Sequence, residues 1–352
     1  MKNNISKVFQ VAVVFIGTIV GAGLASGQEI LSFFTSYGIY SFIGIIFCGL
    51  FYILMGFIVS KISIKYKLTS YGDLIKTVSP NLLGKITGVI TTLYLISSAS
   101  IILAGSGALI NQFFGLPKIL GSLAMIALAI FFLLKDTDGL IEVNSFIVPI
   151  LITTIGVITF LYFMFCKDLM SFNFISKIEP RKTGVALSTV LYSGYNTLCC
   201  LGVIVPLSTK IKNSKTMFWG VSLGAIGLVI LSLIINFLLM VNQPYVYEYE
   251  IPLLLVSQRF GNIIQALLLV VIWLEMFSTE VSDIYSISKT INDTLNISFK
   301  KAIFIVILIS LPISRLGFSN LIGTLYPFFG LLSLLFIGQT VFFYIKHKND
   351  LN

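Results

Sequence analysis

Long apolar segments, separated by short polar ones, run along the whole chain. They lie near residues 7–35, 39–62, 86–112, 118–135, 139–166, 183–208, 214–241, 262–289, 300–316 and 319–345. Each approaches or exceeds the roughly 20 residues that a helix needs to cross a bilayer. Strand-like alternation does not recur at the spacing of a barrel, so the segments predict ten transmembrane helices.

The spacing of these segments repeats along the chain. Each segment of the second half starts between 175 and 182 residues after its counterpart in the first half. Because five is an odd number, a second unit of five helices enters the membrane with the opposite orientation, as in many secondary transporters. We therefore expect one all-α membrane domain over 1–352, with inverted five-helix repeats at 7–166 and 183–345 and a linker at 167–182.

Composition supports this assignment. Of the 352 residues, 57% are hydrophobic and 11% are charged, and the mean hydropathy is +1.00. A soluble domain carries roughly 25% charged residues, so this chain would expose too much apolar surface in water. The net charge of +9 lies in the loops rather than in a nucleic-acid-binding stretch. We expect a lipid bilayer and a small-molecule substrate as partners, no nucleic acid, and a monomer.

The loop charges predict the orientation. With the N-terminus in the cytoplasm, the inner side collects 16 lysines and the outer side 7 basic residues. Cytoplasmic loops normally carry the excess of Lys and Arg. The sequence thus predicts a multi-pass protein of the cell membrane with both termini cytoplasmic. The linker 167–182 is an exception, because its four basic residues would face outward.

The first segment contains a glycine-rich interruption within Gly17–Glu29, at Gly21, Ala22 and Gly23. Glycine permits dihedrals that end a helix, and a helix interrupted within a membrane is tolerated where its backbone lines a cavity. The amide end of the outer half would suit a carboxylate, and the carbonyl end of the inner half would suit Na⁺. Close packing of helices through small residues is the alternative explanation.

The sixth segment predicts a second interruption, at Ser193-Gly194, and two interruptions in matching halves indicate a substrate site. Tyr192 and Asn196 would orient a polar ligand there, although hydrogen bonding between helices explains the same residues. In the third segment, Tyr94 and Ser97 lie on one helical face and would close one wall of the site, or simply decorate a packing face.

The eighth segment is the most polar. One face carries, at helical spacing, Glu275, Ser278, Thr279, Ser282 and Ser286. The hydroxyl groups of Ser278, Thr279 and Ser282, together with a carbonyl of the first segment at Ala22, would form an oxygen cage for Na⁺. Alternatively, Glu275 or Glu280 would carry a proton, since acids within a membrane are costly and usually functional. Asp283 is expected nearer the cytoplasm, paired with Lys289 or Lys300.

Glu29 follows Gly23 by six residues, which is roughly 9 Å along a helix. This places it near an outer vestibule, where it would gate the site, pair with Arg259 or Arg315, or take up a proton. The aromatic and acidic segment 242–261 is either a lid over that vestibule or a passive connector.

Several functional classes are disfavoured. The four cysteines lie in apolar segments, and the one histidine, His347, lies in the C-terminal tail. A histidine-based metal site or a Ser-His-Asp triad within the membrane is therefore excluded. The chain also lacks the GxxxxGK[ST] motif of ATP-hydrolysing pumps. We expect no enzymatic activity and no cofactor other than Na⁺ or H⁺ as a coupling ion.

The motif Gly17-Thr-Ile-Val-Gly-Ala-Gly23 resembles the first-helix signature of the amino acid–polyamine–organocation superfamily. Its extension Leu24-Ala-Ser-Gly-Gln-Glu29 resembles the YkvI-like bacterial membrane proteins. The resemblance implies a LeuT-type five-plus-five fold with broken helices 1 and 6, and a substrate between helices 1, 3, 6 and 8. Carried over to this chain, that site is Gly21, Ala22, Gly23, Tyr94, Ser97, Tyr192, Ser193 and Gly194, and the sodium site is Ser278, Thr279 or Ser282.

The sequence thus predicts a secondary active transporter of a small organic solute, such as an amino acid, that works by alternating access coupled to Na⁺ or H⁺. A membrane sensor that uses the same fold to bind a small molecule without moving it is the alternative. Gradient-driven uptake by the purified protein would separate the two.

Overall fold

The computed structural model describes residues 2–79, 82–134, 140–167, 169 and 172–351. Within these ranges the chain is helical and contains no strand. The helices of sixteen or more residues are α1 (Lys2–Ile19), α4 (Tyr40–Tyr66), α6 (Leu82–Phe114), α7 (Lys118–Leu133), α8 (Leu140–Phe165), α10 (Val185–Ile211), α11 (Ser214–Val241), α13 (Asn262–Leu295), α14 (Phe299–Ser314) and α15 (Phe318–Lys346).

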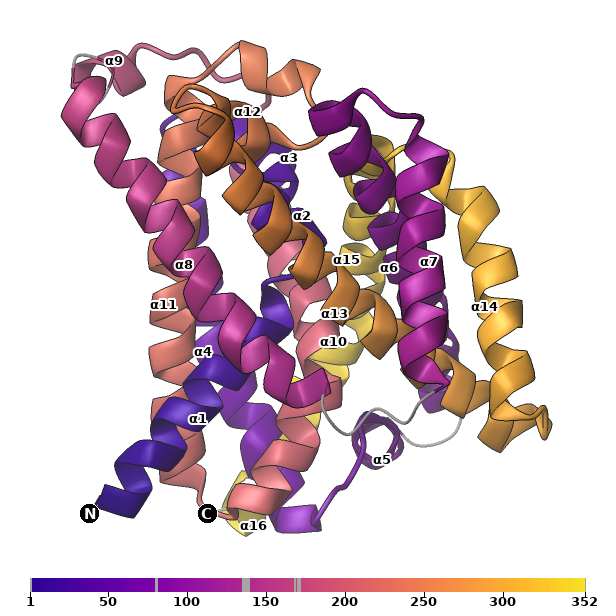
Figure 1. The fold of residues 1–352 in the computed structure, drawn as a ribbon. Coiled ribbons are helices and arrows are strands. Elements are labelled where there is room, and N and C mark those ends of the chain that lie inside the picture. Colours follow the sequence, from indigo (N-terminus) through magenta and orange to yellow (C-terminus); the bar gives the residue numbers. More distant parts are fainter. Residues whose placement is uncertain (1, 80–81, 135–139, 168, 170–171, 352) are drawn as a thin grey trace.

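Shorter helices connect the long ones. They are α2 (Ala22–Ser26), α3 (Gln28–Phe33), η1 (Thr35–Tyr37), α5 (Tyr71–Val78), α9 (Phe172–Ser176), η2 (Tyr245–Glu248), α12 (Pro252–Gln258) and α16 (Lys348–Leu351). The N- and C-termini lie at one end of the molecule with α5, whereas α9 and α12 lie at the opposite end (Figure 1). We call these the terminal end and the α12 end.

Seven helices of the described residues are long and apolar enough to cross a membrane: α4, α6, α8, α10, α11, α13 and α15. Two shorter stretches, Ile5–Ile19 and Lys118–Leu133, are also apolar. The predicted segments coincide with the long helices, and the first one is divided among α1, α2 and α3. The chain is therefore a multi-pass membrane protein, and ten crossings remain a prediction. Residues 135, 139, 168, 170 and 171 of the predicted spans and linker lie outside the described residues.

The helices pack in two groups. α1, α4, α10 and α11 contact one another, and α6, α7, α13 and α14 form a second group, with α15 between α10 and α6 (Figure 1). The set of helix pairs in contact is nearly the same when each of the first five long helices is exchanged for its counterpart among the last five, for example α1 for α10. For example, the pair α1–α11 corresponds to α10–α4, and α6–α15 corresponds to α13–α8. This exchange symmetry is what two related five-helix units would produce.

Small residues allow the first group to pack closely. A side-chain carbon placed on Gly49 or Gly56 of α4 would lie 2.3 or 2.6 Å from Val229 or Val221 of α11. Helices within lipid gain little from the hydrophobic effect between them, so close backbone approach supplies much of their attraction. Large apolar side chains such as Phe165 and Leu308 remain exposed on the outside of the bundle, where lipid would cover them.

Candidate functional site

The first helix stops in the middle of its predicted span. α1 ends at Ile19, Val20 and Gly21 are not helical, and α2 begins at Ala22. Gly21 has extended backbone angles (φ −108°, ψ −168°). The last carbonyl groups of α1 and the first amide groups of α2 therefore lack partners within their own helices. The interruption lies close to the predicted residues Gly21, Ala22 and Gly23.

A second interruption follows at Gly27. This residue has φ 82° and ψ −6°, a left-handed conformation that favours glycine, and it separates α2 from α3. The single helix on which the distance from Gly23 to Glu29 was counted is therefore not present. Because the chain turns at Gly27, the residues that follow do not lie along the axis of α2, and distances counted along a single helix do not apply to them.

Glu29 is affected most by this turn. Its side chain is 3% exposed and folds back toward the interruption, so that a side-chain carbon on Gly23 would lie 2.2 Å from Glu29 Oε1. The Tyr192 hydroxyl donates a hydrogen bond of 3.1 Å to Glu29 Oε2. The expected position of Glu29 in an outer vestibule, paired with Arg259 or Arg315, is wrong. Its carboxyl group lies inside the protein, where we had expected a ligand.

Aromatic rings surround this carboxyl group. Tyr192 packs against Phe33 and Phe34, at centroid distances of 5.2 and 4.9 Å. Tyr195 lies 5.3 Å from Tyr192 and stacks on Tyr326 at 4.4 Å. The rings come from α3 and its C-cap, from α10 and from α15. They shield Glu29 from solvent, and low polarity strengthens its hydrogen bond with Tyr192.

The predicted interruption of the sixth span is wrong. α10 is helical from Val185 to Ile211, through Ser193 and Gly194. Gly194 instead permits a close helix contact, because a side-chain carbon there would lie 2.3 Å from Ser333 Oγ and 3.0 Å from the Gly330 oxygen of α15. The alternative explanation of packing through small residues is therefore the correct one at this position.

The polar residues of α10 point in different directions. Ser193 donates to Cys48 Sγ of α4 at 3.1 Å, and Asn196 donates to the Tyr192 carbonyl of its own helix at 3.1 Å. Both side chains are buried, and within the described part of the chain neither is hydrogen-bonded to Glu29. Tyr192 is the predicted residue of this helix that the structure brings to Glu29.

The third span contributes Tyr94, which is buried and packs edge-on against Phe329 of α15 at 5.5 Å. Ser97 is only half-buried, whereas its neighbour Ser98 is buried and within hydrogen-bonding reach of Asp283. Ser98 rather than Ser97 therefore faces the eighth span in this conformation.

The eighth span, α13, reaches the first interruption at Thr279. Thr279 Oγ1 lies 4.0 Å from the position of a side-chain carbon on Gly21. Ser278 is fully buried, but Ser282 is exposed and bonds to the Ser278 carbonyl. The structure thus brings part of the predicted sodium cage together, namely Thr279 and the chain next to Ala22, and it leaves Ser282 outside.

Three acids of α13 are buried: Glu275, Glu280 and Asp283. Each has at least one carboxylate oxygen without a hydrogen-bond partner among the described residues, and both oxygens of Glu280 lack one. The expected pairing of Asp283 with Lys289 or Lys300 is wrong, because Asp283 is 8% exposed and twelve residues before the end of a helix that continues to Leu295. It therefore lies within the span.

The register of α13 on α6 locates Glu280. Met276 contacts Gly105 of α6, and Asp283 approaches Ser98, which lies seven residues earlier in α6. Residues 276, 280 and 283 share one helical face, so Glu280 lies between these two contacts. The opposing residues of α6 at that level include Ile101 and Ile102, which are buried and apolar.

Within the described residues, one salt bridge is recorded, between Lys118 and Glu250. Glu29, Glu275, Glu280 and Asp283 are thus buried without a basic partner in that part of the chain. Unpaired acids within a membrane protein usually mark an ion or proton pathway.

Sequence reasoning missed the contribution of α15. Tyr326 stacks on Tyr195, and Phe329 packs on Tyr94, so α15 supplies two rings to the cluster. A signal existed in Tyr326-Pro327, a polar aromatic residue and a proline inside an otherwise apolar span. Nothing in the local pattern, however, indicates which neighbouring helix Tyr326 contacts.

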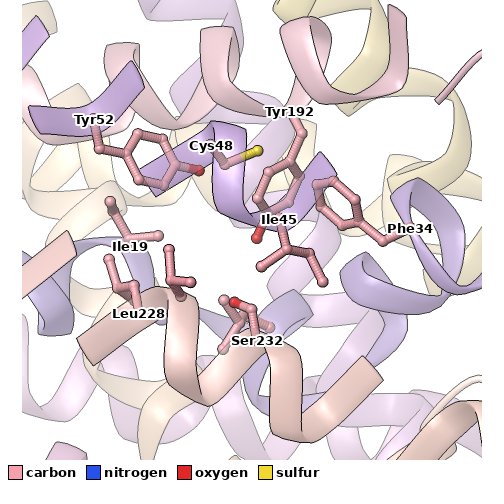
Figure 2. Close-up of a pocket in the computed structure, with 10 residues that line it drawn as sticks. Ile19, Phe34, Ile45, Cys48, Tyr52, Tyr192, Leu228 and Ser232 are labelled. Atoms are coloured by element: carbon pink, nitrogen blue, oxygen red, sulfur yellow. The ribbon is translucent and has the colours of Figure 1, made fainter. Parts of the chain in front are cut away.

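Two small cavities lie on the other side of α10, within the first group of helices. The first cavity measures about 10 Å³ and is lined by Ile19, Leu24, Phe34, Ile45, Cys48, Tyr52, Tyr192, Leu228, Val229 and Ser232 (Figure 2). The second measures about 20 Å³ and lies among Phe15, Tyr52, Met55, Gly56, Val59, Thr197, Cys200, Leu201 and Ile204. Each has room for about one water molecule. Neither lies between α1, α6, α10 and α13, where the substrate was predicted.

Comparison with known proteins places the chain in a family. It is 31% identical over 339 residues to the uncharacterized membrane protein YkvI of Bacillus subtilis, and the match covers 96% of each chain. The chain belongs to the YkvI family. It is also 26% identical over 320 residues to the uncharacterized protein YyaD of the same organism, with 91% of each chain covered. No family model matches this YkvI-family protein.

Solved structures show the fold of this YkvI-family protein. The inward-facing conformation of Mhp1 matches with a TM-score of 0.72 at 16% identity, covering 96% of this chain and 76% of Mhp1. Mhp1 is a nucleobase-cation-symport-1 family transporter. A manganese transporter of Eremococcus coleocola matches with a TM-score of 0.67 at 14% identity, covering 96% and 79%. At such low identity these matches establish a fold of the LeuT type and no shared substrate.

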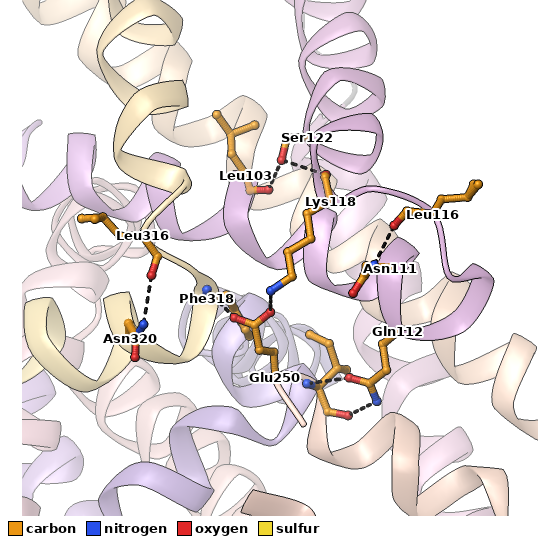
Figure 3. A network of polar contacts seen from close by, with 11 residues as sticks. Leu103, Asn111, Gln112, Leu116, Lys118, Ser122, Glu250, Leu316, Phe318 and Asn320 are labelled. Carbon is orange, nitrogen blue, oxygen red and sulfur yellow. Dashed lines mark hydrogen bonds and ion pairs between the residues drawn. The ribbon is translucent and has the colours of Figure 1, made fainter. Parts of the chain in front are cut away.

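At the α12 end, a polar network fastens the segment between α11 and α13 to α6, α7 and α15 in this YkvI-family protein (Figure 3). Glu250, in the segment between α11 and α13, pairs with Lys118 and accepts a hydrogen bond of 2.9 Å from the Phe318 amide of α15. Gln112 of α6 exchanges two hydrogen bonds with the Ile251 backbone, each 3.0 Å long. The segment 242–261 is therefore held across α6, α7 and α15.

Proposed function

We propose that this protein is a secondary active transporter that moves a small organic solute of the amino-acid class by alternating access, coupled to proton binding. The observation that carries the proposal is the position of Glu29. Its carboxyl group is buried beside the interrupted first helix, bonded to Tyr192 and without a basic partner among the described residues.

The interrupted helix supplies groups for the solute. The first amide groups of α2, which have no partner within that helix, would be fixed hydrogen-bond donors for the solute. Tyr94 and Tyr192 would form aromatic walls from α6 and α10. Because Glu29 places a carboxyl group next to Gly23, the solute carries an amino group that the acid attracts.

Proton coupling is favoured over sodium coupling by the residues of α13. A sodium site needs several oxygen ligands around one point, and Ser282 of the predicted cage is exposed. Glu29, Glu275 and Glu280 are, in contrast, buried acids that need only gain or lose a proton. Desolvation makes an isolated buried charge costly, so the protonation of these groups would be linked to the opening of the site.

The two groups of helices supply the moving parts. α1, α4, α10 and α11 would rock against α6, α7, α13 and α14, with the site between α1, α6, α10 and α13. The contact network of Glu250 holds the segment between α11 and α13 on α7 and α15 at the α12 end. Opening of that end would move this segment and break the network.

Uptake into proteoliposomes tests the proposal. The purified protein is reconstituted and supplied with a radiolabelled mixture of amino acids under an inward proton gradient, an inward sodium gradient, or neither. We expect uptake driven by the proton gradient, and its loss in Glu29→Gln. Glu248→Gln, which removes an exposed carboxylate, is the matched control and should retain uptake.

Three results would contradict the proposal. Uptake driven by sodium alone would overturn the proton coupling. Equal proton-driven uptake by Glu29→Gln and the wild type would remove Glu29 from the mechanism. Saturable binding of an amino acid without gradient-driven uptake by the wild type would favour the sensor over the transporter.

A further inference from the structure

We propose that the two cavities of the first helix group hold ordered water, and that with Tyr52 and Tyr192 they form a proton path between Glu29 and the terminal end. The inference rests on the proposed role of Glu29 as a coupling group. It assigns a function to α4 and to Tyr52, neither of which belongs to the candidate substrate site.

The first cavity meets the physical requirements for a bound water. Its volume of about 10 Å³ is near the minimum for one molecule, and water in a protein needs two to four polar partners. The Tyr52 and Tyr192 hydroxyl groups point into the cavity, and Ser232 of α11 lies beside it (Figure 2). A purely apolar cavity of this size would stay dry, so a water here depends on the Tyr52 and Tyr192 hydroxyl groups, with Ser232 beside them.

Tyr52 gives an independent reason for a water at this place. Its side chain is 5% exposed, and its hydroxyl oxygen has no hydrogen-bond partner in the described part of the chain. A buried hydroxyl group without a partner is costly, so such groups are almost always bonded to protein or to ordered water. Tyr52 lines both cavities and thus lies between them.

The cavities are arranged along the membrane normal. The first is lined by Ile45 and Cys48 of α4, and the second by Met55 and Val59 of the same helix. Residues 45 to 59 span roughly 20 Å of helix, which is a large part of a hydrocarbon core about 30 Å thick. The two cavities therefore lie at successive levels of α4 between Glu29 and the terminal end.

Polar groups continue beyond the second cavity. Ser60 and Ser63 of α4 are buried, and their hydroxyl oxygens lack partners among the described residues. Together with Tyr52 and Gly56 they form one face of α4 by helical spacing. On α10, Thr209 donates to the Ser63 carbonyl at 3.2 Å. This polar face leads toward Tyr66, the last residue of α4.

The proton transfer needs no additional reactant. For protonation of Glu29, Tyr192 gives its hydroxyl proton to Glu29 Oε2 along the existing 3.1 Å hydrogen bond. At the same time the Tyr192 oxygen takes a proton from the first water, which takes one from Tyr52, and the second water replaces the Tyr52 proton. The second water is in turn reprotonated from solvent at the terminal end, through the hydroxyl groups of Ser60 and Ser63. Each relay group gains and loses one proton, so only Glu29 and the solvent at the terminal end change charge.

The titratable groups around Glu29 show which of them links the acid to the path. The titratable side chains near its carboxyl group are Tyr192, Tyr195 and Cys199 of α10, Tyr326 of α15, and Tyr52 of α4. Tyr192 is the one of these that both bonds to Glu29 and lines a cavity. It therefore forms the link between the acid and the path.

Time-resolved infrared difference spectroscopy tests this path on the full-length protein in proteoliposomes. The probe is a pH jump on one side of the membrane, and the readout is the carboxyl band that is present in the wild type and missing in Glu29→Gln. We expect Tyr52→Phe, which keeps the ring, to slow the response of this band at least about tenfold for jumps at the terminal end. Ser232→Val, which fills the first cavity, should slow it similarly.

Tyr162→Phe is the matched control, because it removes another buried phenol hydroxyl that lines neither cavity. It should leave the rate unchanged. A Glu29 band that responds at the wild-type rate in both Tyr52→Phe and Ser232→Val would overturn the path and leave the proposed function intact. A wild-type protein in which no Glu29 band responds to pH would overturn the coupling role of Glu29 and the path with it.

Discussion

Tyr192 donates its hydroxyl hydrogen bond to Glu29 over 3.1 Å and thereby joins two elements that are 163 residues apart in sequence. Glu29 belongs to α3, just beyond the interrupted helix, whereas Tyr192 lies within the continuous helix α10. The bond connects corresponding first and sixth spans of the chain. A change in the charge of Glu29 would therefore act on both helices that border the candidate site.

Tyr192→Phe should reduce stability while preserving the ring contacts. The variant leaves the buried Glu29 carboxyl group without its donor, and an unmade hydrogen bond to a buried group costs about 1–3 kcal/mol. The change is measured by unfolding in detergent micelles. In a double-mutant cycle with Glu29→Gln, the two effects should not add, since the variants share one interaction. Additive effects would show that the bond contributes nothing.

Gly23→Ala should displace Glu29. The new methyl group would lie 2.2 Å from Glu29 Oε1, so the carboxyl group has to leave its position. We expect proton-driven uptake to fall at least about tenfold, as for loss of a positioned proton-transfer group. Adding Glu29→Asp, which shortens the side chain, should restore part of it. Gly202→Ala is the control, because nothing lies within 4 Å of that site. Full uptake by Gly23→Ala would argue against this position for Glu29.

Gly194→Ala should loosen the contact between α10 and α15. The methyl group would lie 2.3 Å from Ser333 Oγ and 3.0 Å from the Gly330 oxygen. Overpacking of this kind costs about 1–3 kcal/mol, measured as a change in the free energy of unfolding. Ser333→Ala in the same chain should recover part of the loss. If Gly194 instead marked a flexible interruption of the helix, Ala would be neutral or stabilising.

Asp73 provides a pH-dependent prediction outside the membrane spans. Partial burial raises the pKa of Asp73, but hydrogen bonds from Thr69 and Ser70 outweigh it and hold the pKa below its usual 3.8. The ionised group therefore stabilises the start of α5 above pH 3.8, and this stabilisation is lost as the pH falls through the lowered pKa. Hydrogen exchange of residues 71–78 should be faster in Asp73→Asn at neutral pH. If the exchange rates of wild type and Asp73→Asn differed equally at a pH below the folded and unfolded pKa values of Asp73, this assignment would be contradicted.

The sequence predicts helices well and their interactions poorly. The positions of the long helices follow from runs of apolar residues, because each helix satisfies its backbone locally. Gly21 marks a true interruption and Gly194 a packing contact, although both occur as glycines within apolar segments. The difference depends on the neighbouring chain: Gly194 faces the backbone of α15, and nothing near Gly194 in the sequence encodes that contact.

The position of Glu29 shows a related limit. The left-handed turn at Gly27 changes the direction of the chain before Glu29. A distance counted along a single helix therefore places Glu29 in the outer vestibule, whereas its side chain is buried inside the protein. Likewise, Asp283 follows a polar stretch that resembles a helix end, yet α13 continues for twelve more residues. Polar character alone does not indicate depth in the membrane, because interior helices pack polar faces against one another.

The most direct test of the account is the charge that moves when the outside of a supported proteoliposome layer is acidified without substrate. A proton that binds Glu29 crosses part of the membrane field and gives a transient current. We predict this charge movement in the wild type and in Glu248→Gln, and a several-fold smaller one in Glu29→Gln. A charge movement in Glu29→Gln equal to that of the wild type would contradict it.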